Sequence, residues 1–297
     1  MTFKHLLSAV AVLSFSGMAL TPAQSADSKN TRASFAPPGD ATNISIPQSS
    51  DPDVLVFTSP PRETVEEGQR IYAPIAAYLS KAIGKTIIYR HPGTWGAYRS
   101  EMLKGSYDLI FDGPHFNSYR AEKLNHNILV KLPGRHEFVV IVRKDEKYAT
   151  VSQMGGRRFC SHAPPNLGAL VLLSQFDNPA RQPYIVPTDG WDKIYEGVVS
   201  GQCSGGILPL ANLQKLDKNG AMKVIHKTAP MPNQAFSAGP RLSIEEQAKI
   251  AMALTSPNAV GPTEKLRSTF KGEQLISASN TEYNGIAQYL RAEWGYY

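Results

Sequence analysis

Short apolar segments with strand character alternate with helix-like segments along most of the chain, and this alternation restricts its fold more than any other feature. The first such segments are 54–57, 86–89 and 107–111, and the residues between them carry apolar side chains at helical spacing. Parallel strands need a long crossover connection, usually a helix, so this order predicts βαβ units with a parallel sheet. An extended apolar segment, 138–142, ends this first series.

The same order then begins again, which indicates a second lobe. The later strand-like segments are 158–161, 184–186 and 203–208. Trp95 is followed ten residues later by Gly105, and Trp191 is followed ten residues later by Gly201, with an offset of 96 residues. That offset is too long for a solenoid repeat and fits two similar lobes. We therefore expect an α/β fold with two lobes, each a mostly parallel sheet flanked by helices.

The N-terminal residues do not follow this pattern. Lys4, the apolar run 6–20 and the small residues 23–26 have the layout of a secretory signal, and the run is short for a membrane span. We expect residues 1–26 to be a signal peptide that is cleaved on export to the periplasm. Residues 27–52 are rich in Ser, Asn, Thr, Asp and Pro, which predicts a flexible leader.

The rest of the chain divides where the pattern restarts. The expected divisions are 53–142 for the first segment of lobe 1, 143–232 for lobe 2, and 233–297 for a return strand and C-terminal helices on lobe 1. A capping box at Ser243–Glu246 opens a predicted helix that runs to Leu254. A last helix is predicted at 283–294, and residues 255–281 carry no clear pattern.

The charge of the chain is positive and dispersed. The net charge of +6 becomes +5 without residues 1–26, because Lys4 is the single Lys, Arg, Asp or Glu residue among them. The sequence has no block of Lys and Arg residues and no interleaving of basic with aromatic residues, so we do not expect a nucleic-acid partner. The balance is compatible with a small anionic ligand.

The chain has two cysteines, Cys160 and Cys203. In an oxidising compartment an even pair is more often a disulfide than two free thiols. The two residues fall on the first and third strands of the predicted second lobe, which are neighbours in a doubly wound sheet and close enough to be bridged. The sequence favours the disulfide over a nucleophilic pair made by Cys160 and His162 on one face of their strand.

In open parallel sheets, ligands bind beyond the carboxyl ends of the strands. The polar residues expected at these ends include Ser59, Asp112, His115 and His162. The predicted helix N-termini near Trp95 and at Asn166-Leu167-Gly168 also face the cleft, and free amides at such ends suit an anion. None of these four polar residues is a Lys or an Arg.

From about Val54 to Leu254, the chain resembles the family of periplasmic phosphate-, phosphite- and phosphonate-binding proteins that serve ABC transporters. The matching segments are Tyr72–Leu79, Tyr107–Pro114, Phe138–Arg143 and Met154–Phe159. The resemblance implies a type II periplasmic-binding fold whose lobes are joined by two crossover strands and close on a small oxyanion. It also implies delivery to a membrane permease by a monomer that has no cofactor and no catalytic activity.

The ligand positions of the family match this sequence in part. Tyr98 matches an aromatic residue of the first lobe, and Asp112–His115 match the turn after the next strand. Ala163–Gly168 replace a turn rich in Ser and Thr, Trp191-Asp192 replace a His-Asp pair, and Asn233-Gln234 replace an acidic residue. The candidate ligand-binding residues are Ser59, Tyr98, Asp112, His115, His162, Asn166, Leu167, Gly168, Trp191 and Asp192.

Two alternative functions remain open. A sensor that docks on a membrane kinase would have the same fold. A periplasmic metal-binding protein would use His115, His136 and His162, because imidazole is a common metal ligand, although these residues lack a short metal-binding spacing. The sequence contains no phosphate-cradling Gly-rich loop, dinucleotide fingerprint or esterase elbow.

Overall fold

The computed structural model describes residues 54–270, 272–291 and 293. The predicted signal peptide, 1–26, and the predicted leader, 27–52, lie outside these residues. All described residues belong to one compact unit, 46–297. Within the described part of the chain, no helix has the length and apolarity that spanning a bilayer requires.

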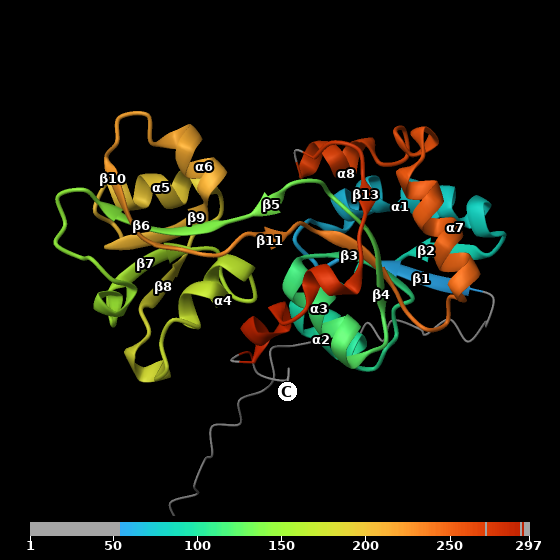
Figure 1. Cartoon of the computed structure of the whole chain (residues 1–297), viewed down its shortest axis with the longest axis horizontal. Coiled ribbons are helices and arrows are strands. Elements are labelled where there is room, and N and C mark those ends of the chain that lie inside the picture. The colour runs from blue at the N-terminus through green and yellow to red at the C-terminus, as the bar shows by residue number, and fades with distance from the viewer. Residues whose placement is uncertain (1–53, 271, 292, 294–297) are drawn as a thin grey trace, which may run out of the picture. The chain divides into compact units, whose positions relative to one another are not determined.

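The first lobe contains a six-stranded sheet in the order β13-β4-β12-β3-β1-β2 (Figure 1). Its strands are β1 (Val54–Thr58), β2 (Thr86–Tyr89), β3 (Leu109–Asp112), β4 (Asn127–Lys131), β12 (Ala235–Ala238) and β13 (Ile276–Ser277). Its helices are α1 (Val65–Ile83), α2 (Trp95–Leu103), α3 (Pro114–Lys123), α7 (Ile244–Thr255) and α8 (Glu264–Thr269), with a short 3-10 helix η3 (Pro257–Ala259).

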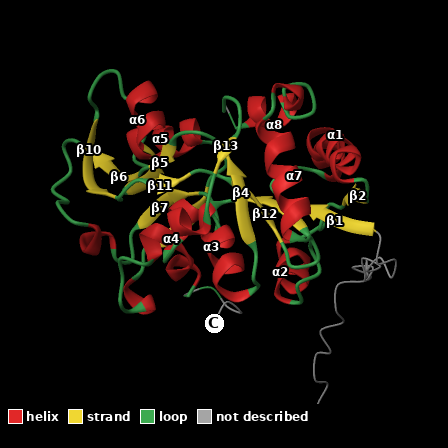
Figure 2. Ribbon diagram, turned by 45° about the vertical axis from the view of Figure 1, so that its right-hand side comes forward, coloured by secondary structure: helices red, strands yellow, loops and turns green. Residues whose placement is uncertain are grey.

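Helices cover both faces of this sheet, as Figure 2 shows. Successive residues of a strand point to opposite faces. Leu55 and Phe57 accordingly belong to the apolar cluster that includes α1, α7 and α8, whereas Val56 belongs to the cluster that includes α2 and α3. The sheet is therefore buried on both sides, and its open edge at the strand ends is the place for a site.

The second lobe contains a five-stranded sheet in the order β10-β6-β9-β7-β8. Its strands are β6 (Phe138–Arg143), β7 (Arg158–Ser161), β8 (Tyr184–Pro187), β9 (Gly205–Pro209) and β10 (Met222–Lys227). Its helices are η1 (Val151–Met154), α4 (Leu167–Leu173), η2 (Pro179–Arg181), α5 (Trp191–Val199) and α6 (Leu210–Leu216). The expected repeat is visible here, because α2 and α5 both begin at Trp and are followed by Gly105 and Gly201 with positive φ.

Both sheets are mixed, whereas the sequence analysis expected them to be mostly parallel. In each lobe three strands are parallel, β2-β1-β3 and β8-β7-β9. The strands that enter from the other lobe, β12 and β6, run antiparallel to them because the chain arrives from the opposite direction. Segment 138–142, which we assigned to lobe 1, therefore lies in the sheet of lobe 2.

Two short strands connect the lobes. β5 (Arg135–His136) pairs with β11 (Met231–Pro232) in an antiparallel ladder between the two sheets (Figure 1). The chain leaves the first lobe through β5 and returns through β11 into β12. The type II periplasmic-binding fold with two crossover strands is thus confirmed.

The C-terminal residues contact both lobes. Instead of one helix at 283–294, the structure has two 3-10 helices, η4 (Asn280–Tyr283) and η5 (Ile286–Leu290), which are separated by Gly285 with φ of 78°. Trp294 lies outside the described residues. Ile286 packs into a core cluster of the second lobe, and Leu290 packs into a first-lobe cluster that also contains Leu170 of α4. We call residues 280–290 the C-terminal strap.

The predicted disulfide is confirmed. Cys160 of β7 is bonded to Cys203, with Cα atoms 5.7 Å apart. Cys203 lies just before β9, which begins at Gly205, rather than on the strand. A Cβ atom at Gly197 of α5 would lie 2.7 Å from Cys160 Sγ, so the absence of a side chain at this position lets the helix pass over the bridge.

Candidate functional site

Asp112, at the carboxyl end of β3, is the centre of a buried ion-pair network in the first lobe. Its Oδ1 atom accepts from Arg62 Nη2 at 2.8 Å and from the Gly113 amide at 2.6 Å. Its Oδ2 atom accepts from Arg120 Nη2 at 3.0 Å and from the Tyr98 hydroxyl. Asp112 and Arg120 have side chains with 0% exposure, so this network is part of the lobe interior.

Tyr98 lies beneath this network rather than at an open surface. Its exposed fraction is 0%, and burial raises the pKa of its hydroxyl far above the ordinary value. The hydroxyl therefore stays protonated, donates to Asp112 and accepts from Arg120 Nη1 at 2.8 Å. In this arrangement Tyr98 positions Asp112.

Arg62, which is not among the predicted site residues, brings a positive charge to Asp112. It lies four residues after Thr58, the last residue of β1, and 27% of its side chain is exposed. In the sequence Arg62 stands in the loop that follows Pro60-Pro61, three residues after Ser59. Arg120 is the seventh residue of α3, and no local sequence signal marks it.

Glu63, next to Arg62, is a second acidic group that was not predicted. Burial raises the pKa of its carboxyl, and the positive charge of Arg62 opposes this effect. Its Oε2 atom is buried and has no hydrogen-bond partner among the described residues. Glu63 therefore offers an unused acceptor beside a cationic group.

His115 lies at one of the contacts between the first lobe and the second. Its Nε2 atom lies 3.1 Å from the carbonyl oxygen of Pro165, in the loop before α4. The residue is 3% exposed, and burial lowers its pKa to about 4. Its Nδ1 atom is buried without a partner in the described structure. His115 belongs to the first turn of α3, where Gly113 is the N-cap and no side chain caps the helix.

Ser59 is occupied within the first lobe. Its hydroxyl lies 2.9 Å from the Tyr89 hydroxyl, and Ser59 has 0% exposure. Gly68 of α1 makes room for this pair, because a Cβ atom there would lie 2.7 Å from the Tyr89 hydroxyl oxygen. Ser59 therefore orders the end of β1.

His162 and Trp191 lie together in the second lobe. Their rings are perpendicular, with centroids 4.4 Å apart, and Trp191 also lies 6.3 Å from the ring of Phe138. Burial lowers the pKa of His162, and Asp189, whose Oδ1 atom is 3.7 Å from His162 Nδ1, opposes this effect. Asp192 is exposed in the first turn of α5.

The side chain of Asn166 caps the start of α4. Asn166 Oδ1 accepts from the Gly168 amide at 2.9 Å, so this amide already has a partner. Leu167 is buried in the core of the second lobe, and a Cβ atom at Gly168 would lie 3.1 Å from Phe138 Cε1. Asn166 thus serves as the N-cap of α4.

The two lobes contact each other near the start of α4, at what we call the seam. Besides the contact between His115 and Pro165, Leu170 of α4 shares an apolar cluster with Tyr98 and Phe116 of the first lobe. The amide of Leu170 donates to the carbonyl of Asn166 at 3.0 Å, which ties this cluster to the start of α4.

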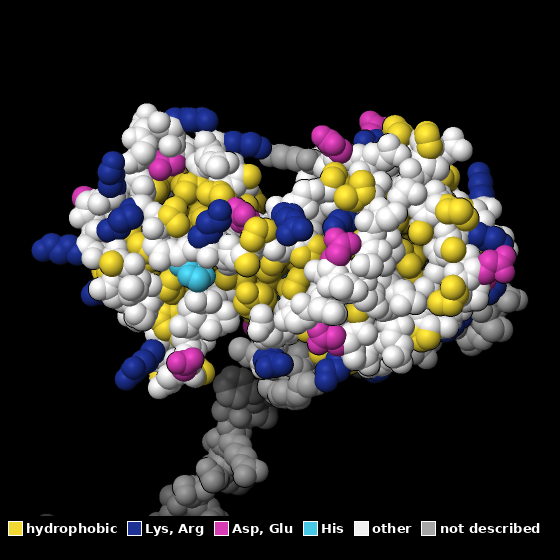
Figure 3. Space-filling model, in the orientation of Figure 1, with side chains coloured by type: hydrophobic (Ala, Val, Ile, Leu, Met, Phe, Trp, Pro, Cys, Tyr) yellow, Lys and Arg dark blue, Asp and Glu magenta, His cyan; other side chains and the backbone are white. Residues whose placement is uncertain are grey.

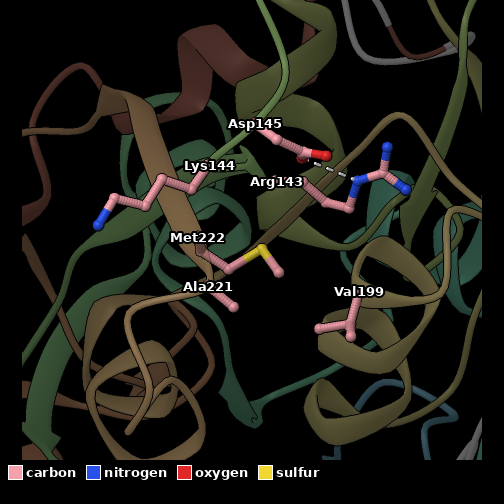
Figure 4. A pocket seen from close by; sticks show the side chains of 6 residues that line it. All are labelled: Arg143, Lys144, Asp145, Val199, Ala221 and Met222. Carbon is pink, nitrogen blue, oxygen red and sulfur yellow. Dashed lines mark hydrogen bonds and ion pairs between the residues drawn. The ribbon is translucent and has the colours of Figure 1, made fainter.

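A hollow of about 260 Å³ lies elsewhere on the second lobe (Figure 4). Its lining residues are Arg143, Lys144, Asp145, Val199, Ala221 and Met222. Because β6 pairs Phe138 with Pro209 and Arg143 with Met222, this hollow lies at the edge of the sheet opposite the carboxyl end of β9. Arg143 is paired there with Asp145, with Nε and Oδ1 3.2 Å apart. The hollow is separate from the candidate site.

The three histidines weighed as metal ligands make separate contacts. His136 Nε2 lies 3.1 Å from Gln234 Oε1, whereas His115 contacts Pro165 and His162 contacts Trp191. Among the described residues, no group of three or more His, Cys, Asp and Glu side chains could hold a metal ion. On the face drawn in Figure 3, Lys and Arg side chains are spread over both lobes rather than gathered in one patch.

Comparison with known proteins agrees with this architecture. A family model described as "ABC transporter, phosphonate, periplasmic substrate-binding protein" matches residues 57–283. A comparison with curated proteins finds no significant match.

Several solved structures are similar in fold at low sequence identity. PhnD1 of Prochlorococcus marinus in complex with methylphosphonate has a TM-score of 0.58 and 14% identity, covering 81% of this chain and 98% of that one. A Xanthomonas citri protein bound to ATP has a TM-score of 0.62 and 12% identity, covering 80% and 97%. A binding-protein component of an ABC phosphonate transporter from Pseudomonas aeruginosa has a TM-score of 0.55 and 14% identity, covering 80% and 85%.

Proposed function

Since this chain belongs to the family of periplasmic substrate-binding proteins of phosphonate ABC transporters, we propose that its ligand binds at the seam beside Arg62 and the first turn of α3. The family consists of binding proteins rather than enzymes, so the site has to hold and release a small phosphonate without reacting with it. We further propose that residues 1–26 are removed on export and that the monomeric protein delivers its ligand to a membrane permease.

Arg62 is the observation that carries this assignment. Its guanidinium is partly exposed, so it has donors left for a ligand after pairing with Asp112. Counted together, Arg62, Arg120 and Asp112 bring two positive charges and one negative charge to this end of the sheet. The uncapped first turn of α3 adds the positive end of a helix dipole. An anion at this position would make charge-assisted hydrogen bonds, which are the strong ones.

The second lobe would complete the site. We propose that His162 and Trp191 contact the organic substituent of the ligand, because their perpendicular rings form an apolar wall with one polar edge. Asp192 and Asn166 would contribute polar contacts at the rim. Ser59 and Tyr98 would act indirectly, by holding the end of β1 and the Asp112 carboxylate.

Isothermal titration of the purified protein with methylphosphonate, phosphate and sulfate tests this function. We expect methylphosphonate to bind and Arg62→Gln to weaken its binding about 10- to 100-fold, as for loss of a hydrogen bond between charged groups. Arg70→Gln is the matched control, because Arg70 is exposed on α1 and pairs with Glu67. The proposal fails if no probe binds the wild-type protein, or if Arg62→Gln and Arg70→Gln bind methylphosphonate equally well.

A further inference from the structure

His115 presents a hydrogen-bond acceptor to the proposed site. A carbonyl oxygen can only accept, so His115 Nε2 has to carry the proton that it shares with Pro165. The Nδ1 atom of the neutral ring is then an acceptor with its lone pair unused. Burial lowers the pKa of His115 to about 4, which keeps the ring neutral near pH 7. Asp112 opposes that shift, whereas Arg62 and Arg120 add to it.

The guanidinium of Arg62, a strong donor, lies near the same position as His115 Nδ1. A Cβ atom added at Gly113 would lie 3.2 Å from His115 Nδ1 and 3.6 Å from Arg62 Nη2. An acceptor and a guanidinium therefore both lie within 4 Å of the position that a side chain at Gly113 would take. The Nδ1 atom is buried and has no partner among the described residues, although most buried polar atoms in proteins are paired.

We propose that His115 Nδ1 accepts a hydrogen bond from a protonated oxygen of the bound oxyanion, so that the site selects anions that retain a hydroxyl group. This inference rests on the proposed function and names the ionic form of the ligand. A ligand oxygen beside Gly113 would accept from Arg62 and donate to His115. Hydrogen phosphate and a singly ionised phosphonate have such an oxygen, and sulfate does not.

Selectivity follows from the unpaired acceptor. A fully deprotonated oxygen would place its lone pairs against the lone pair of Nδ1 and leave it unsatisfied. Sites built around buried polar groups reject ligands that leave those groups unpaired. The acceptor also depends on Pro165, a residue of the second lobe, because the hydrogen bond to its carbonyl sets which ring nitrogen carries the proton. The preference is therefore defined where the two lobes meet.

A substitution can separate the roles of the two ring nitrogens of His115. In His115→Gln, the side-chain amide can still donate to Pro165 from the position of Nε2 but has no acceptor at the position of Nδ1. His126→Gln is the matched control, because His126 is also a buried first-lobe histidine with an unpartnered Nδ1 atom and contacts Gly239 instead. Circular dichroism and thermal unfolding establish that both variants are folded.

Titrations with methylphosphonate and sulfate, from about pH 6 to about pH 9, test the inference. Above the second ionisation of methylphosphonate, wild-type affinity should fall about tenfold per pH unit, because only the singly ionised form binds well. His115→Gln should lose about tenfold or more in affinity near pH 6, lose this pH dependence, and discriminate less against sulfate. His126→Gln should behave as wild type.

The outcomes distinguish the inference from the function on which it rests. Binding of methylphosphonate with unchanged affinity and pH dependence in His115→Gln would overturn the role of Nδ1 and leave the binding function in place. Equal wild-type affinity for sulfate and methylphosphonate would also overturn it, and would indicate that water fills the space beside Gly113. If the wild-type protein binds neither probe, the proposed function itself fails.

Discussion

Arg120 and Asp112 form an ion pair in which both side chains have 0% exposure, with Nη2 and Oδ2 3.0 Å apart. The pair places the Asp112 carboxylate where it can also hold Arg62 at the edge of the site. The stability of the first lobe and the geometry of the site therefore depend on the same carboxylate.

Asp112→Asn should destabilise the protein strongly. Removing one partner of a buried pair leaves an uncompensated charge, and the expected loss in the free energy of unfolding is about 3–5 kcal/mol. Arg62→Gln removes a partly exposed partner and should cost about 1 kcal/mol or less. Urea unfolding followed by circular dichroism measures both values. Equal stability of Asp112→Asn and wild type would contradict the buried network.

Glu63→Gln should increase affinity for simple anions. Its carboxyl stands next to Arg62, so an ionised Glu63 repels an anion bound there, and the glutamine retains the shape without the charge. We expect methylphosphonate to bind about threefold to tenfold more tightly by isothermal titration, as expected for one screened charge near a protein surface. Weaker binding by the variant would show that Glu63 contacts the ligand directly.

Stability should fall as the pH is lowered from neutral. Burial lowers the pKa of His115 to about 4 and that of His126 to about 3, from 6.5 for an ordinary histidine. Between these values and 6.5, the unfolded chain binds protons that the folded protein does not, so the free energy of unfolding decreases as the pH decreases. The contribution of His115 is roughly 3 kcal/mol, fully present above pH 6.5 and lost near pH 4.

Urea unfolding at a series of pH values checks this sign. His126→Gln should reduce the difference in stability between pH 7 and pH 4, because it removes one of the histidines whose pKa is lowered by burial. If the variant has the same pH dependence as wild type, the pKa of His126 is not lowered in the folded protein.

Loss of the disulfide should lower stability without changing the fold. Cys160 and Cys203 are separated by 43 residues, and closing a loop of that length in the unfolded chain corresponds to about 4 kcal/mol in the chain-entropy model. The double variant Cys160→Ala, Cys203→Ala should unfold at lower urea concentration than wild type. Dithiothreitol should lower the wild-type midpoint and leave that of the double variant unchanged. Insensitivity of the wild type to the reductant would argue against the bond.

Much of the fold could be predicted because alternating apolar segments mark the strands, and the segments between them mark the helices. The start of α2 at Trp95 and of α5 at Trp191, and the pairing of Cys160 with Cys203, followed from local pattern and strand adjacency. The direction of β6 and β12 did not, because a strand looks the same in sequence whether it enters a sheet from its own lobe or from the other.

The site was harder to predict because residue type does not reveal which polar groups pair inside the protein. Tyr98 and Ser59 stand where ligand contacts were expected, but each is turned to a buried partner. Arg62 lies a few residues beyond its strand, and Arg120 pairs with Asp112 from within α3. Neither pairing could be predicted from the positions of these residues along the chain. Only the three-dimensional arrangement shows which groups are left unpaired.

The order of the segments along the chain has a consequence for how the protein forms after synthesis. The second lobe is continuous, from β6 to β10, and its disulfide is internal to it. The first sheet needs β12 and β13, and the C-terminal strap follows both of them along the chain. Domains generally fold as units during translation or translocation. The second lobe can thus fold while the first still lacks β12 and β13, so contacts between the two lobes would form after the second lobe has folded.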